Sequence, residues 1–282
     1  MNDLPLGTFV TYNPSSVGPD TPIEKAESLM QRYGARHLPV VDQRKAVVGI
    51  VSNHDVATAR TRRAQLVSAT GNEGVNCEND ILRIHEIMTR DVLTIDQNDT
   101  PRQALDVLLQ RHVHCLPVVD ERRLVGMLTS TDFLRNLSYG EMACGRDPVR
   151  KHMTGIQAQV DDDATLDEAW RIFRETGCDY LAAVKGECPV GVVSRRALRL
   201  AMRGEPAGLG REDLREESPA TIAPLVDTSA PEVRPHASLV QAVNKMLQSQ
   251  VPVIPVVNRT NAFVGLLTED DVLRAMLEDF QS

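Results

Sequence analysis

The sequence predicts a mixed α/β fold of the α+β kind, built from four copies of one β-α-β-β-α unit. One observation is a pattern of glycine, apolar residues and a hydroxyl residue, closed by aspartate in three of four copies: GIVSNHD (Gly49 to Asp55), GMLTSTD (Gly126 to Asp132), GVVSRRA (Gly191 to Ala197) and GLLTEDD (Gly265 to Asp271). The other is an apolar strand before each copy: HLPVVD, CLPVVD, YLAAV and VIPVV. The glycines lie 126 − 49 = 77, 191 − 126 = 65 and 265 − 191 = 74 residues apart. This spacing exceeds a solenoid period, so each copy is a small domain-sized element.

The elements of the second copy show the expected order. A short strand, Asp91 to Asp96, leads to Thr100 and Pro101, a hydroxyl cap followed by proline at the first helical position. An amphipathic helix comes next, then two strands joined by a charged turn at Glu121 to Arg123, and a second helix from Asp132. The first helix of each copy has apolar residues at helical spacing: Ile23, Ala26, Leu29 and Met30; Ala104, Leu105, Leu108 and Leu109; Leu166, Ala169, Trp170 and Phe173; Leu239, Ala242, Val243, Met246 and Leu247.

A unit of about 55 residues buries too little surface to be stable alone, so the units are expected to pair. We predict a first module, residues 1–140, with repeat 1 at about 5–67 and repeat 2 at about 83–140. The second module, residues 141–282, holds repeat 3 at about 147–204 and repeat 4 at about 219–282. The polar stretches 61–80 and 203–221 are interpreted as surface excursions or flexible joints.

Composition excludes several classes of protein. The chain has 282 residues, 42% hydrophobic and 25% charged, with a net charge of −8. Without a basic face, nucleic acid is not expected as a partner. No apolar run has membrane-helix length and no secretory signal is recognised, so a cytoplasmic protein without a membrane partner is expected. Five cysteines without C-x-x-C spacing indicate free thiols. Residues 1–140 carry a net charge of 15 − 17 = −2 and residues 141–282 one of 16 − 22 = −6.

Together, the x-L-P-V-V-D strand and the G-h-h-[ST]-x-x-D pattern resemble the CBS domain, the nucleotide-sensing module named after cystathionine β-synthase. The resemblance covers nearly the whole chain, as four CBS units forming two pairs, each pair a Bateman module. It implies clefts in which an adenosine ligand is held by a hydroxyl residue and by an aspartate on the ribose. By position these are Ser52 and Asp55, Thr129 and Asp132, and Thr268 and Asp271. Repeat 3 has Ser194, but Ala197 replaces the aspartate and Ala182 the proline.

The residues themselves leave alternatives open. S/T-x-x-D is also a helix capping box, and a helix N-terminus attracts anions as well, so both roles can share one site. The residues three before the proline position are Arg36, His114, Asp179 and Pro252. Arg36, His37 and His114 form a candidate phosphate-binding set for the first module, or are solvated strand-edge charges. A metal on His112 and His114 is a further reading, but no Cys or carboxylate nearby in sequence completes four ligands.

No catalytic motif for serine hydrolysis, zinc proteolysis, phosphate-loop or dinucleotide binding is present. We therefore expect a non-enzymatic regulatory protein that binds an adenosine ligand and controls a protein partner. Energy sensing through that ligand is the expected role. AMP, ADP or ATP is the expected ligand, with S-adenosylmethionine or NAD as further candidates. Alternatives are a structural scaffold with empty clefts, or an enzyme handling nucleotides or a metal. Four units can assemble as a homodimer or as a pseudo-symmetric monomer.

Overall fold

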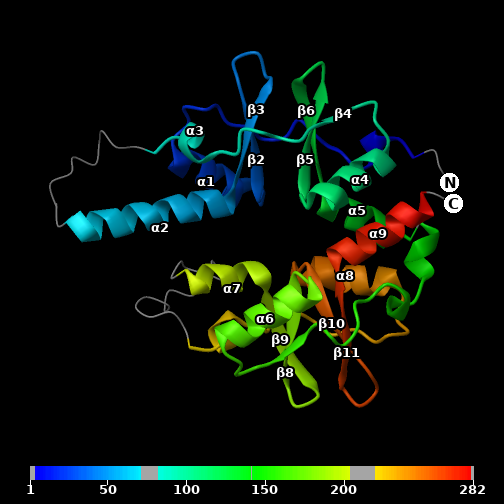
Figure 1. The fold of residues 1–282 in the computed structure, drawn as a ribbon. Helices are drawn as coiled ribbons and strands as arrows, with labels where there is room; N and C mark the ends of the chain where they lie inside the picture. Colours follow the sequence, from blue (N-terminus) through cyan, green and yellow to red (C-terminus); the bar gives the residue numbers. More distant parts are fainter. Residues whose placement is uncertain (1–3, 71–81, 141, 204–219, 281–282) are drawn as a thin grey trace. The chain divides into compact units, whose positions relative to one another are not determined.

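The computed structural model describes residues 4–70, 82–140, 142–203 and 220–280, with the side chains of residues 62 and 64–70 left out (Figure 1). The chain forms two compact units, one ending at Thr129 and the other beginning at Ser130. The mixed α and β architecture expected from the sequence is confirmed. The module boundary at residue 140 stays a prediction.

The first unit holds repeat 1 and all of repeat 2 except its last helix. Its elements are β1 (Thr11–Tyr12), α1 (Ile23–Tyr33), β2 (His37–Val41), β3 (Val47–Ser52), α2 (Asn53–Thr70), α3 (Ile84–Ile87), β4 (Ile95–Asp96), α4 (Pro101–Arg111), β5 (Cys115–Asp120) and β6 (Arg123–Thr129). Hairpins β2–β3 and β5–β6 are antiparallel. They are joined at their turns, where the Leu124 amide donates to the Lys45 carbonyl at 2.9 Å.

The second unit repeats this plan. Its elements are α5 (Ser130–Ser138), β7 (Gln159–Asp161), α6 (Leu166–Thr176), β8 (Tyr180–Lys185), β9 (Cys188–Ser194), α7 (Arg195–Met202), α8 (Leu239–Ser249), β10 (Val253–Val257), β11 (Phe263–Thr268) and α9 (Glu269–Asp279), with short 3-10 turns between them. Helix α5 packs against α8 and α9 through buried Phe133, Leu134 and Leu137. The hairpins β8–β9 and β10–β11 are again antiparallel.

Local sequence explains the helix starts. Thr100 accepts a hydrogen bond from the Gln103 amide, and Pro101 occupies the first helical position, as the sequence predicts. Thr165 and Ser238 cap α6 and α8 in the same way. The apolar stripe of each of these helices is buried or half-buried, so the helical spacing read from the sequence is confirmed.

Each repeat also begins with a short extended segment that runs parallel to its central strand. The pairs are Val17 with Val40, Ile95 with Val118, Val160 with Ala183, and Val233 with Val256. The partners are equally far apart in sequence in all four repeats, so the four copies share one register as well as one order of elements.

Within each unit, a segment near the start of one repeat pairs with a strand of the other repeat. Thr11 pairs with Met127 of repeat 2, and Thr89 pairs with Ile50 of repeat 1. In the second unit Thr154 pairs with Leu266, and Asp227 with Val192. The two repeats of a module therefore complete each other's sheets.

The motif glycines lie under these exchanged segments. A Cβ atom on Gly265 would lie 2.3 Å from the Thr154 carbonyl oxygen, and one on Gly191 would lie 2.5 Å from that of Asp227. In the first unit the nearest atoms belong to side chains, Met88 Sδ at 2.5 Å from Gly49 and Val10 Cγ1 at 2.3 Å from Gly126. Glycine opens each motif because the exchanged segment leaves no space for a side chain.

One boundary expected from the sequence is wrong. Residues 61–70, expected from the sequence to be a surface excursion or a flexible joint, instead continue helix α2 up to Thr70. Arginine, alanine and glutamine support a helix despite their polarity, and the first glycine comes only at residue 71. Residues 71–80 and 204–219 of the expected joints, with Cys77, lie outside the described residues. In the described part of the chain, no helix combines the length and apolarity needed to cross a membrane.

Candidate ligand-binding sites

The hairpin of repeat 1 brings four of the predicted residues to one end of the sheet. His37 begins β2 and lies opposite Ser52, the last residue of β3. The next amide, that of Asn53, donates to the Arg36 carbonyl at 2.9 Å. Asp55 follows in the first turn of α2. Arg36, His37, Ser52 and Asp55 therefore gather at the N-terminus of one helix, where free N–H groups favour an anion.

Ser52 and Asp55 form a capping box. Oδ2 of Asp55 accepts hydrogen bonds from the Ser52 amide at 2.8 Å and the Ser52 hydroxyl at 2.7 Å, and the Asp55 amide donates to that hydroxyl at 3.2 Å. Thr268 and Asp271 repeat this geometry in repeat 4, at 2.9, 2.7 and 3.2 Å. The capping alternative left open by the sequence is thus realised. One oxygen of each aspartate accepts the capping hydrogen bonds, so only the other oxygen could also bind a ligand.

In repeat 2, Thr129 ends β6 opposite Cys115, and exposed His114 directly precedes β5. Asp132 lies in the first turn of α5, where Arg135 Nη1 is 3.3 Å from its Oδ1. Burial raises the pKa of the Cys115 thiol to about 12, which keeps it protonated at neutral pH.

The arrangement required for a metal on His112 and His114 is not found. His112 ends helix α4 in the left-handed conformation, with φ 51°, and β5 begins only at Cys115. The two histidines therefore do not alternate along one strand, so no shared strand face presents them together to a metal.

Repeat 3 departs from the other copies. The Ala197 amide donates to the Ser194 hydroxyl at 3.1 Å, so the cap persists without its carboxylate, and Ala197 is buried. Arg195, the first residue of α7, folds back over the end of α6. Its Nε donates to the Cys178 carbonyl at 2.8 Å and its Nη2 to the Phe173 carbonyl at 2.9 Å. Sequence reasoning missed this residue, because an arginine beside a helix cap gives no distinctive sequence signal.

In the second unit, acidic residues lie at the end of the sheets that corresponds to the Arg36 and His37 end in repeat 1. Tyr180 begins β8, and its pKa is raised first by burial and then by the negative charges of Glu269, Asp179 and Asp270. Asp271 is itself buried. Burial raises its pKa, against the opposing effects of the Thr268 hydrogen bonds and the Arg274 charge. The position of Arg36 in repeat 1 is thus held by an acid, Asp179, in repeat 3.

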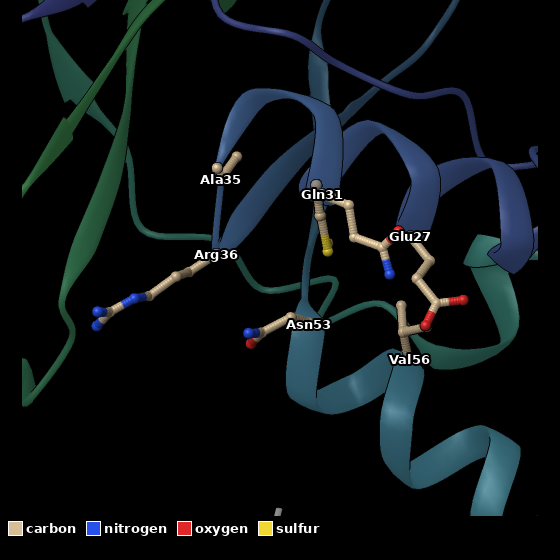
Figure 2. A pocket seen from close by; sticks show the side chains of 8 residues that line it. Glu27, Gln31, Ala35, Arg36, Asn53 and Val56 are labelled. Carbon is tan, nitrogen blue, oxygen red and sulfur yellow. The ribbon is translucent and has the colours of Figure 1, made fainter. Parts of the chain in front are cut away.

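A pocket of about 310 Å³ opens beside the gathered residues of repeat 1 (Figure 2). It is lined by Glu27, Met30, Gln31, Gly34, Ala35, Arg36, Asn53 and Val56. Figure 2 shows Asn53 and Val56 on α2, across from the part of α1 that carries Glu27 and Gln31. The Arg36 side chain extends away from the other labelled side chains, while its carbonyl accepts the hydrogen bond from the Asn53 amide.

A fold of β-α-β-β-α repeats, in which the second helix of repeats 1, 3 and 4 begins at a hydroxyl cap, defines the class of this protein. The family model for the CBS domain matches residues 6–62, 84–139, 149–204 and 223–278. The chain belongs to the CBS domain family, and the family expected from its motifs is confirmed.

Known proteins extend the comparison. The chain is 29% identical over 197 residues to the uncharacterised protein MJ1404 of Methanocaldococcus jannaschii, covering 65% of this chain and 44% of that protein. It spans less than half the length of the curated relatives that it matches. The structure of MJ1225 from the same organism, described as a putative archaeal homolog of g-AMPK, matches with a TM-score of 0.66 at 21% identity, over 97% of this chain and all of that one. A structure of CBSX2 in complex with AMP is 28% identical over 48% of this chain and 96% of that chain, with a TM-score of 0.39.

Proposed function

We propose that this chain is a non-catalytic regulatory protein that binds an adenosine ligand and passes a conformational change to a protein partner. The observation that carries the proposal is the grouping in repeat 1 of a hydroxyl, a carboxylate and two basic residues beside an open pocket. Membership of the CBS domain family supports the regulatory role. A cytoplasmic location and a homodimeric or pseudo-symmetric monomeric assembly stay predictions from the sequence.

Each grouped residue has a role that fits its geometry. Oδ2 of Asp55 serves the cap, which leaves Oδ1 to accept a ribose hydroxyl. Arg36 supplies positive charge, His37 a ring N–H donor, and the helix N-terminus amide donors for a phosphate. The corresponding candidates in repeat 2 are Thr129, Asp132 and His114. Those in repeat 4 are Thr268 and Asp271. AMP, ADP or ATP fits this set best, with S-adenosylmethionine and NAD as further candidates.

The exchanged segments provide a route for coupling. The capped start of α2 directly follows β3, and β3 is held at Ile50 by Thr89, which leads into repeat 2. A ligand that changes the α2 start therefore acts on a strand shared between repeats. It can shift the equilibrium only by its differential affinity for the two states.

The test is ligand-induced stabilisation of the full chain. AMP, ADP, ATP, S-adenosylmethionine and NAD are added at millimolar concentration, and a ligand that binds only the folded state raises the melting temperature. Arg36→Ala should weaken ATP binding by about tenfold, the size expected for one lost charge-assisted hydrogen bond, and should weaken adenosine binding less. Arg44→Ala is the matched control, because Arg44 is exposed at the opposite end of the same hairpin.

A structural scaffold with empty clefts is the second candidate. The observation in its favour is that capping boxes satisfy the motif residues of repeats 1 and 4 without a ligand. The same panel decides between the two candidates. A chain whose melting temperature responds to no adenosine compound would be a scaffold, and the sensor proposal would be withdrawn.

A further inference from the structure

Asn53 and Arg195 occupy the same position in repeats 1 and 3. Each is the residue after the hydroxyl cap, and each donates its backbone amide to the residue two after a left-handed glycine. Asn53 donates to Arg36 at 2.9 Å and Arg195 to Asp179 at 2.8 Å. The glycines, Gly34 and Gly177, have φ of 62° and 71°. The two repeats therefore build one backbone frame, in which only the side chains differ.

In repeat 1 this frame surrounds the open pocket, whose lining includes Met30, Ala35, Arg36 and Asn53. Counting from the glycine, the counterparts of the first three in repeat 3 are Phe173, Cys178 and Asp179. Counting from the hydroxyl cap, the counterpart of Asn53 is Arg195. The Arg195 guanidinium contacts each of the other three. It lies 5.5 Å from the centre of the Phe173 ring and donates to the Phe173 and Cys178 carbonyls. Its Nε is 3.5 Å from Oδ1 of Asp179.

Arginine suits this space for physical reasons. The end of helix α6 presents carbonyl groups and a negative dipole end, which a guanidinium satisfies with several donors in a fixed plane. The same group stacks on an aromatic face. Asparagine at position 53 is too short to reach the equivalent carbonyls. Repeat 1 also has Arg36 where repeat 3 has Asp179. It therefore lacks the acid that would pair with an arginine at position 53.

We propose that Arg195 occupies the repeat 3 counterpart of the repeat 1 pocket and closes it to small molecules. Arg195 is thus a specificity-determining residue: its side chain fills the space in repeat 3 that stays open to a ligand in repeat 1. The identity of the excluded ligand, an adenosine compound, rests on the proposed function. Closure itself rests only on the contacts of Arg195.

Cys178 gives a readout that needs no ligand, because it stands at the position of pocket-lining Ala35. In the full chain, Arg195→Asn should raise the rate of Cys178 alkylation by iodoacetamide by about tenfold, since alkylation requires that the reagent reach the sulfur as well as that the thiolate form. Exposed Cys188 serves as the internal reference.

Arg196→Asn is the control, because Arg196 is the exposed neighbour on the same helix and the charge change is identical. Peptide mass spectrometry measures each site, and circular dichroism confirms that the variants are folded. An unchanged Cys178 rate in folded Arg195→Asn protein would overturn closure, as would an equal rise in Arg196→Asn.

Calorimetric titration with ATP and AMP tests the ligand arm. Arg195→Asn combined with Ala197→Asp, which restores the missing carboxylate, should bind one more equivalent than the wild type. The reciprocal change, Asn53→Arg with Arg36→Asp, copies repeat 3 into repeat 1 and should bind one fewer. Unchanged stoichiometry in both variants would overturn the specificity role. A wild type that binds neither nucleotide would instead refute the proposed function, and Cys178 alkylation would still decide closure.

Discussion

Repeats 1 and 3 share a backbone frame but differ in charge and in filling. Repeat 1 has Arg36 and a short Asn53 beside an open pocket, whereas repeat 3 has Asp179 and an arginine that folds inward. The hydroxyl caps are alike in both. The comparison teaches that the fold fixes one backbone frame in both repeats, while two or three side chains at equivalent positions decide how the space inside that frame is filled.

The largest expected effect tests the frame itself. Gly265→Ala or Gly191→Ala should lower the free energy of unfolding by about 3 kcal/mol, because the new methyl group meets a backbone carbonyl that cannot yield. Gly49→Ala should cost about 1 kcal/mol, since the nearest atom is the sulfur of a flexible methionine. Urea unfolding measures these losses, with Gly18→Ala, whose nearest atom is 3.8 Å away, as control. Equal losses at all four glycines would show that the exchanged segments do not restrict these positions.

The next effect concerns ligand binding and separates the modules. Asp55→Ala should weaken ATP binding by about 1–3 kcal/mol through the lost acceptor, beyond the roughly 1 kcal/mol of stability that a cap contributes. Asp271→Ala removes the same capping geometry from the acidic second module and should change ATP affinity much less. Titration calorimetry on both variants measures the difference. If both variants lose stability and neither loses affinity, the aspartates act only as caps.

The smallest effect is a pH dependence of the second module. Because burial raises the pKa of Asp271 in the folded state, the folded protein holds this proton to higher pH than the unfolded chain. The group's contribution to stability therefore falls as pH rises above the unfolded value of about 4. Asp271→Asn removes this titration, so the stability lost by the substitution should be larger at pH 4 than at pH 7. A loss that is constant or that grows with pH would contradict the assigned shift.

Local patterns in the sequence predict much of the fold. Thr100 and Pro101 mark a helix start, and the apolar stripes mark the buried faces, because caps and periodicity act within one or two turns. The exchanged segments escaped prediction, since a pairing such as Thr154 with Leu266 joins residues far apart in sequence. The sequence motifs predicted the residues of the candidate site in repeat 1, but they gave no indication that Arg195 fills the equivalent space in repeat 3. Its role depends on the carbonyls of Phe173 and Cys178, which only tertiary structure places within reach.

The exchange of segments beneath the motif glycines has a consequence for how such a chain can be divided. Each repeat carries an edge that belongs to its neighbour's sheet, so strand pairing interlocks the two repeats. Two repeats of one module produced as separate polypeptides should therefore associate as complementing fragments, each supplying the other's missing edge. The same interlocking makes the pair, rather than the single repeat, the smallest piece that can be duplicated or transplanted with its fold intact.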